Sequence, residues 1–264
     1  MHHHGLMTRP LIGITSEMAA AGWGDRVREA VVLPASYAWA LQRAGCIPVL
    51  VPPAPHGAGG LVARLDAVVF SDGGDIDPRR WGGKPGEPGG PAVDPGGPAV
   101  DPVRDAGEFA LMRAAIEARL PLLAIGRGMR VLNAVRGGSV ASRPPREEAD
   151  GRGGPGTNGS ADAAGQADPE IRISQGSRLG RVLGPSLSLP GPAWPAGGQA
   201  GQAVDRLGGG LAAVAWAADD TVLALELAGH PFAIGLQWHP ELDEDPRIFE
   251  ELRKAAAAGH QEAA

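Results

Sequence analysis

The chain has 264 residues, a formal net charge of −6 and a pI near 5.6. This acidic balance excludes the basic electrostatic footprint that nucleic-acid-binding proteins carry. The sequence shows neither an apolar run approaching about 18 residues nor a secretory signal pattern at its start, so we expect a cytoplasmic protein that does not engage a membrane.

A single cysteine, Cys46, excludes an internal disulfide bond. It follows Gly45 at the end of a predicted helix and has no neighbouring histidine, so we interpret it as a packed residue and not as a nucleophile. We expect no metal and no organic cofactor. The consecutive histidines near the start are interpreted as part of a tag or disordered N-terminus at residues 1–8.

The length favours one α/β domain, which we place at residues 9–258, before a disordered tail at 259–264. Flexible insertions are predicted near 82–102 and 142–170. The first contains the string G-G-P-A-V-D-P twice in tandem. Because lengthening a loop costs little closure entropy, we interpret the repeat as a surface insertion without a function of its own.

Strand and helix signals alternate along the first half of the domain. This order predicts right-handed βαβ units in a parallel sheet. The predicted strands lie at 11–14, 47–51, 67–71, 122–125, 211–216, 222–227 and 232–237, and the predicted helices at 33–45, 60–65, 104–120, 177–183 and 245–258.

The stretch 120–138 predicts a sharp turn from a buried strand into a helix. An apolar run is followed at once by Gly126, Arg127 and Gly128 and then by apolar residues at helical spacing. Hydrolytic α/β enzymes place a nucleophile at such an elbow, because the turn lifts one side chain clear of the sheet beside free helix N–H groups. Here the residue at the apex is Gly126, which has no side chain.

A second glycine-containing loop, S-D-G-G-D-I-D-P, follows the predicted strand at 67–71. Gly73 and Gly74 would let the backbone approach a ligand closely and present N–H groups to an oxyanion. From these residues alone, a simple tight turn remains an equal alternative.

The elbow string A-I-G-R-G-M-R-V-L-N-A-V-R-G-G resembles G-I-C-R-G-M-Q-L-L-N-x-x-x-G-G of the γ-glutamyl-γ-aminobutyrate hydrolase family, in the class I glutamine amidotransferase-like superfamily. The likeness extends over about residues 9–256. It implies a flavodoxin-like three-layer α/β sandwich, with a mainly parallel central sheet and helices on both faces. It also implies that Gly126 stands at the position of the catalytic cysteine and leaves that position vacant.

The resemblance assigns roles to further residues. In the string G-L-Q-W-H-P-E, His239 would be the base and Glu241 its orienting carboxylate. Gly73 and Gly74, together with the N–H of Arg127, would form the oxyanion hole.

Two departures from the family pattern concern the substrate side. Relatives tend to show N-S-x-H-H-Q where this chain has G-G-Q-A-G-Q, so only Gln202 remains as a substrate-binding residue. Asp72 stands where the family loop, T-G-G-G-D-V-D-P, has a glycine. A carboxylate is therefore expected near the point that should receive negative charge.

Three functional interpretations stay open. The first is a non-catalytic relative that binds a small γ-glutamyl or amide ligand, or a protein partner. The second is an inactivated form of a working γ-glutamyl hydrolase. The third is an enzyme of altered chemistry in which His239 activates water, assisted by Asp72 or Ser71. A homodimer formed through exposed sheet edges is also left open.

Overall fold

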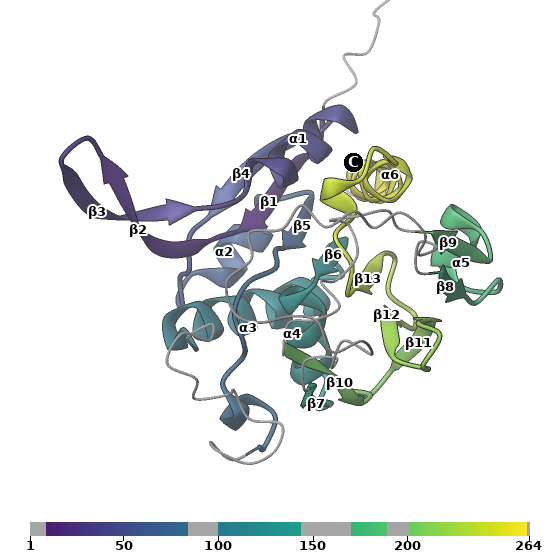
Figure 1. Cartoon of the computed structure of the whole chain (residues 1–264). Helices are drawn as coiled ribbons and strands as arrows, with labels where there is room; N and C mark the ends of the chain where they lie inside the picture. Colours follow the sequence, from purple (N-terminus) through teal and green to yellow (C-terminus); the bar gives the residue numbers. More distant parts are fainter. Residues whose placement is uncertain (1–8, 84–99, 144–169, 189–200, 263–264) are drawn as a thin grey trace, which may run out of the picture.

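The computed structural model describes residues 9–83, 100–143, 170–188 and 201–262 (Figure 1). The predicted N-terminal tag, most of both predicted insertions and the last residues of the tail lie outside this part of the chain. The prediction of a single domain with these bounds therefore stays a prediction.

The described part is built on a nine-stranded, mixed sheet (Figure 1). Its first five strands are parallel, and the remaining four continue the sheet in antiparallel pairing. This architecture confirms the predicted flavodoxin-like fold. In spatial order the strands are β4 (Ile47–Val51), β1 (Leu11–Thr15), β5 (Ala67–Phe70), β6 (Leu122–Ile125), β13 (Ala233–Leu236), β12 (Val222–Leu227), β11 (Leu211–Trp216), β8 (Glu170–Ile173) and β9 (Ser186–Ser188).

Helices cover both faces of this sheet. Alternate residues of β6 enter opposite apolar clusters, with Leu123 and Ile125 on one face and Leu122 and Ala124 on the other. Such burial on both faces explains why the strand is a continuous apolar run. The first face is covered by α1 (Ala35–Arg43), α5 (Arg178–Leu183) and α6 (Arg247–Glu262), and the second by α2 (Ala58–Val62), α3 (Pro102–Glu117) and α4 (Arg127–Val135).

Two small antiparallel sheets were not predicted. β7 (Ser139–Arg143) pairs with β10 (Gly201–Arg206), and β2 (Glu17–Trp23) pairs with β3 (Arg26–Val32). The β2–β3 hairpin projects from the body as an arm (Figure 1). The alanines and the glycine of β2 are poor strand formers, so the valines of β3 have no matching strand signal before them in the sequence.

Among the helices of the described ranges, none combines the length and the apolar character needed to cross a membrane.

Cys46 is fully buried, and burial raises the pKa of its thiol to about 11. Both observations on Cys46 confirm its interpretation as a packed residue.

Candidate functional site

The carboxyl ends of three adjacent parallel strands bring the predicted site residues together. β5, β6 and β13 are neighbours in the sheet, and such strand ends are where ligands bind in α/β folds. β5 leads into the loop that begins at Ser71, β6 into the elbow at Gly126, and β13 toward His239 at the start of the short 3-10 helix η3 (Pro240–Leu242).

The elbow has the predicted strand-turn-helix geometry. Gly126 lies between β6 and α4 with φ 53° and ψ −109°, a conformation that costs a residue with a side chain about 1–3 kcal/mol. Its N–H donates a hydrogen bond of 2.7 Å to the Leu236 carbonyl. A Cβ at Gly128 would lie 2.6 Å from the Phe70 carbonyl oxygen, so the second glycine lets α4 approach β5.

Asp72 fills the space above the elbow. A Cβ atom at Gly126 would overlap the Asp72 carboxylate. The Oδ1 atom of Asp72 accepts a 2.6 Å hydrogen bond from the N–H of Arg127, and its Oδ2 atom lies 3.6 Å from His239 Nε2. The carboxylate therefore occupies the place that a nucleophile at position 126 would need. It also engages the N–H that the family resemblance assigns to the oxyanion hole.

His239 and Glu241 form the expected pair. His239 Nδ1 lies 2.8 Å from Glu241 Oε1, and Glu241 is 4% exposed. Burial lowers the pKa of His239, but the hydrogen bond and charge of Glu241, together with the charge of Asp72, outweigh burial and raise that pKa above its usual value. The imidazole thus lies between two carboxylates that favour its protonated form.

Two further side chains surround Asp72, and neither carries a signal in the sequence. The Tyr37 hydroxyl accepts a 3.0 Å hydrogen bond from the Asp72 N–H, and burial raises the pKa of that hydroxyl, as does the charge of Glu241. Arg130 Nη2 lies 3.8 Å from Asp72 Oδ1. Together they surround Asp72 with a hydroxyl, a cation and the backbone of the elbow.

Arg127 fixes the loop from behind. Its Nη1 atom donates to the carbonyl oxygens of Gly74 and Asp75, both at 3.0 Å. Its Nε atom donates to Glu108 at 3.0 Å and its Nη2 atom to Asp105 at 2.5 Å. The side chain is 1% exposed, so one residue offers its N–H to the site and holds the facing loop with its guanidinium.

Arg104 explains the glycine at position 73. A Cβ at Gly73 would overlap its guanidinium, which donates to the Asp72 carbonyl at 2.7 Å and to Ser71 Oγ at 3.1 Å. Ser71 Oγ in turn donates to the Thr15 carbonyl at 2.8 Å. Ser71 is thus built into the frame, and the oxyanion-hole role of Gly73 and Gly74 stays a prediction.

Gln202 is used by the protein itself. Its Oε1 accepts from the Ile76 N–H and its Nε2 donates to the Ile76 carbonyl, both at 3.0 Å. The side chain is 2% exposed. Substrate binding by Gln202 stays a prediction, and the structure gives this residue a supporting role for the loop.

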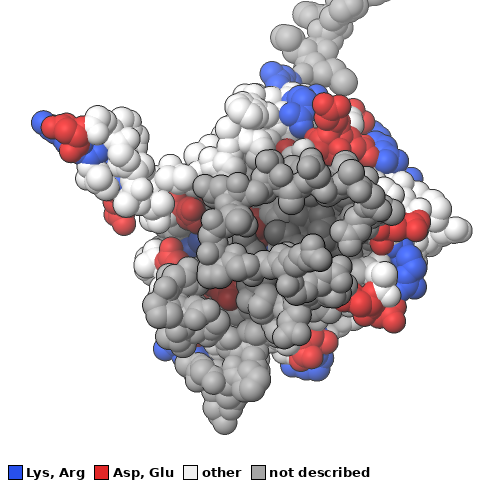
Figure 2. All heavy atoms as spheres, in the orientation of Figure 1, with Lys and Arg blue, Asp and Glu red and all other residues white. Residues whose placement is uncertain are grey.

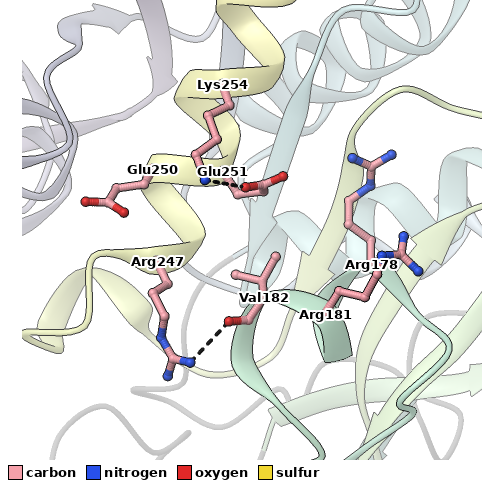
Figure 3. A pocket seen from close by; sticks show the side chains of 7 residues that line it. All are labelled: Arg178, Arg181, Val182, Arg247, Glu250, Glu251 and Lys254. Atoms are coloured by element: carbon pink, nitrogen blue, oxygen red, sulfur yellow. Dashed lines mark hydrogen bonds and ion pairs between the residues drawn. The ribbon is translucent and has the colours of Figure 1, made fainter.

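A separate groove lies between α5 and α6 (Figure 3). Its volume is about 280 Å³. Arg247 donates to the Val182 carbonyl at 3.1 Å, and Lys254 pairs with Glu251 at 3.0 Å. No residue of this groove belongs to the Asp72 site. The lining residues are Arg178, Arg181, Val182, Arg247, Glu250, Glu251 and Lys254.

The described side chains include no group of three or more His, Cys, Asp or Glu residues arranged to hold a metal ion.

Fold and site together define a class I glutamine amidotransferase-like protein. Residues 10–241 match the Peptidase C26 family, and the chain belongs to that family.

Individual relatives agree with this assignment. The chain is 34% identical over 260 residues to Rv2859c of Mycobacterium tuberculosis, named as a glutamine amidotransferase, which covers 96% of the chain and 78% of the relative. It is 28% identical over 217 residues to a γ-glutamyl-γ-aminobutyrate hydrolase of Shigella flexneri, which covers 79% and 78%.

A solved structure supports the fold alone. A Thermoplasma acidophilum protein described as part of a GMP synthase superposes with a TM-score of 0.57 at 13% identity, covering 99% of this chain and 98% of that one.

Proposed function

We propose that this protein is a non-hydrolytic member of its family that binds a small γ-glutamyl-type ligand at the Asp72 site. The observation that carries this proposal is the position of the Asp72 carboxylate, which lies over Gly126 and accepts the Arg127 N–H at 2.6 Å. An amide hydrolase of this type needs a nucleophile and an unoccupied oxyanion hole at that point.

The chemistry of the two positions is complementary. Gly126 supplies no nucleophile, and Asp72 places a negative charge where the substrate carbonyl oxygen would have to enter. His239 then faces Asp72 at 3.6 Å, which holds the carboxylate in place. An enzyme of this kind that loses its nucleophile keeps a rate enhancement of only about 10³ to 10⁴ over the reaction in water. This residual enhancement comes from the oxyanion hole and from substrate binding. With the hole engaged as well, we expect no turnover.

The ligand class rests on the relatives. A relative named γ-glutamyl-γ-aminobutyrate hydrolase matches most of this chain. In this chain, His239 and Glu241 are paired at 2.8 Å. We therefore expect wild-type protein to bind γ-glutamyl-γ-aminobutyrate in calorimetry without releasing glutamate. Absence of binding would favour a protein partner in place of a small ligand.

The decisive experiment restores the two positions separately and together. Gly126→Cys alone places its side chain against Asp72, and Asp72→Gly alone lacks a nucleophile, so we expect both single variants to be silent. The double variant should release glutamate from γ-glutamyl amides. Multiple turnover by the wild-type protein would refute the proposal, and activity of Gly126→Cys alone would show that Asp72 does not block the site.

The second candidate is a hydrolase of altered chemistry that uses His239 and Glu241. It is favoured by the proximity of Asp72 Oδ2 to His239 Nε2, at 3.6 Å, because a carboxylate and an imidazole could share a water molecule. This mechanism predicts turnover by the wild-type protein that is lost in His239→Gln. Equal release of glutamate by both proteins would remove His239 from any mechanism.

Inactivation of a working hydrolase by a single replacement fits the structure less well. Asp72 can take its observed position only because position 126 carries no side chain. The two residues are therefore matched to each other, and we expect that replacing Gly126 alone will not produce an active site.

A further inference from the structure

Within the described part of the protein, the tip half of the β2–β3 arm is open to solvent, whereas Ala19, Ala21, Ala30 and Val32 are half-buried. β2 and β3 pair only with each other, and Trp23 and Val27 are 61% and 74% exposed. A two-stranded hairpin without packing on a face is marginal in water. Figure 2 shows charged residues of both signs gathered at the tip of the arm, and mostly uncharged surface with some acidic atoms between the tip and the body.

The two faces of the arm differ in charge pattern. Side chains alternate between faces along each strand, so the cross-strand register assigns them. The first face carries Glu17 and Val32 at the base, then Ala19, Ala30 and Ala21, and then Arg28, Trp23 and Arg26 toward the tip. The second face carries Met18, Val31, Ala20, Glu29, Gly22 and Val27.

We propose that the first face of the arm packs against the same face of a second copy of this chain, around a twofold axis. Antiparallel packing would place the acidic base of each arm, at Glu17, beside Arg26 and Arg28 near the tip of the other. The tip also carries Asp25, 4.0 Å from Arg26, so the two arginines leave it with a net positive charge. The alanines of the middle would let the two backbones approach closely. A twofold interface must be self-complementary in this way, and the charge order along this face satisfies that condition.

The second face does not satisfy it. Glu29 pairs with Ala20 at the middle of the arm, so a twofold axis there would bring two copies of Glu29 together. Like charges across an interface are strongly unfavourable. The charge pattern therefore selects the face that carries Glu17 and Arg26.

The base of the arm is connected to the Asp72 site. Glu17 Oε2 accepts a 2.8 Å bond from Arg104, whose guanidinium also donates to the Asp72 carbonyl at 2.7 Å. Glu17 is still 45% exposed, so it can meet a cation of a second copy while keeping Arg104. A single residue, Arg104, would therefore link the dimer interface at Glu17 to the Asp72 loop.

Cross-linking tests which face is in contact. The full chain with Ala21→Cys, on the first face, should form a covalent dimer with a short bismaleimide. Its neighbour Ala20→Cys, on the second face, is the matched control and should form no covalent dimer. The buried Cys46 leaves the wild-type protein as a blank. Equal cross-linking at both positions, or none at position 21, would overturn the proposal.

Charge reversal tests the pairing of base and tip. Sedimentation of the wild-type protein should show a dimer. The double variant Arg26→Glu with Arg28→Glu should raise the dissociation constant of the dimer by about tenfold or more, because its new carboxylates then meet Glu17 of the other copy. Glu29→Arg, on the other face, should leave the constant unchanged. A monomeric wild-type protein, or a dimer indifferent to the reversal at the tip, would refute the arm interface.

Discussion

The loop that begins at Ser71 and the β2–β3 arm differ in how the rest of the protein holds them. The loop is tied down by Arg127, Arg104 and Gln202, all of which are buried. The arm has strand pairing between its own two halves, and its base is held by the bond of Glu17 with Arg104. One segment is fixed by the protein's own side chains, whereas the other presents an open surface.

This difference shows where the chain concentrates its buried polar interactions. Charged groups buried together are costly to remove one at a time, because the partner is left unpaired. Exposed residues on an arm contribute little to the stability of one chain. The following substitutions test this contrast.

The largest effect is expected at Arg127. Replacing it with methionine leaves Asp105 with only Arg80, at 3.9 Å, and Glu108 with only Arg104, at 2.8 Å. Removing one partner of a buried ion pair costs up to about 3–5 kcal/mol. Urea denaturation should show this decrease in the free energy of unfolding. Arg113→Met, an exposed position on the same helix as both acids, is the control, and a similar small loss at both positions would contradict the network.

Gly126→Ala should have the next largest effect, because two costs add. The backbone conformation costs about 1–3 kcal/mol, and the new methyl group overlaps Asp72. Gly137→Ala is the matched control, since Gly137 has φ 83° but open space around it. In an Asp72→Gly background, the extra loss at position 126 should disappear; if it persists, Asp72 does not fill the elbow.

Gln202→Met should cost about 1–3 kcal/mol, the usual range for leaving buried polar groups unpaired. The affected groups are the N–H and carbonyl of Ile76. Hydrogen exchange of the Ile76 amide should accelerate together with the loss of stability. Gln42→Met, at an exposed position of α1, serves as the control, and unchanged exchange in Gln202→Met would separate Gln202 from the loop.

The ion pair of His239 predicts a pH dependence. A raised folded-state pKa gives stability that is fully present below the unfolded pKa, about 6.5, and is lost as pH rises through the folded pKa. The advantage of wild type over His239→Gln should therefore shrink from acidic to alkaline pH. The control, His230→Gln, should show the opposite slope, because burial lowers the pKa of His230. Parallel slopes would reject the assignment.

The smallest effect is expected at the arm. Trp23→Ser should change the free energy of unfolding of a single chain by no more than about 0.5 kcal/mol, since Trp23 is 61% exposed. The free energy of unfolding should be measured at low protein concentration, where dimer formation does not contribute to it. A large loss would mean that the arm is an integral part of the fold.

The parallel core was readable from the sequence because its signals are local. Strand β6, the glycines of the elbow and the strand at Ile47–Val51 follow from apolar runs and turn residues. The arm was missed because Ala19, Ala21 and Ala30 carry no strand preference. Its pairing instead depends on a register with the opposite strand.

The site was predicted in part. His239 and Glu241 were assigned as a pair through the family resemblance, and the structure places them in contact, while their catalytic roles stay predictions. The motif could not show that Asp72 reaches over Gly126, because that contact joins two loops 54 residues apart in the chain. The hydrogen bonds of Gln202 and Arg104 to backbone groups could not be predicted either, because their partners, Ile76 and Asp72, lie far away along the chain.

The fit of Asp72 over Gly126 also bears on how the site can be altered. A side chain introduced at position 126 needs the space that the Asp72 carboxylate fills. Substitutions at the two positions should therefore not be additive, and a double-mutant cycle between them would measure the coupling energy.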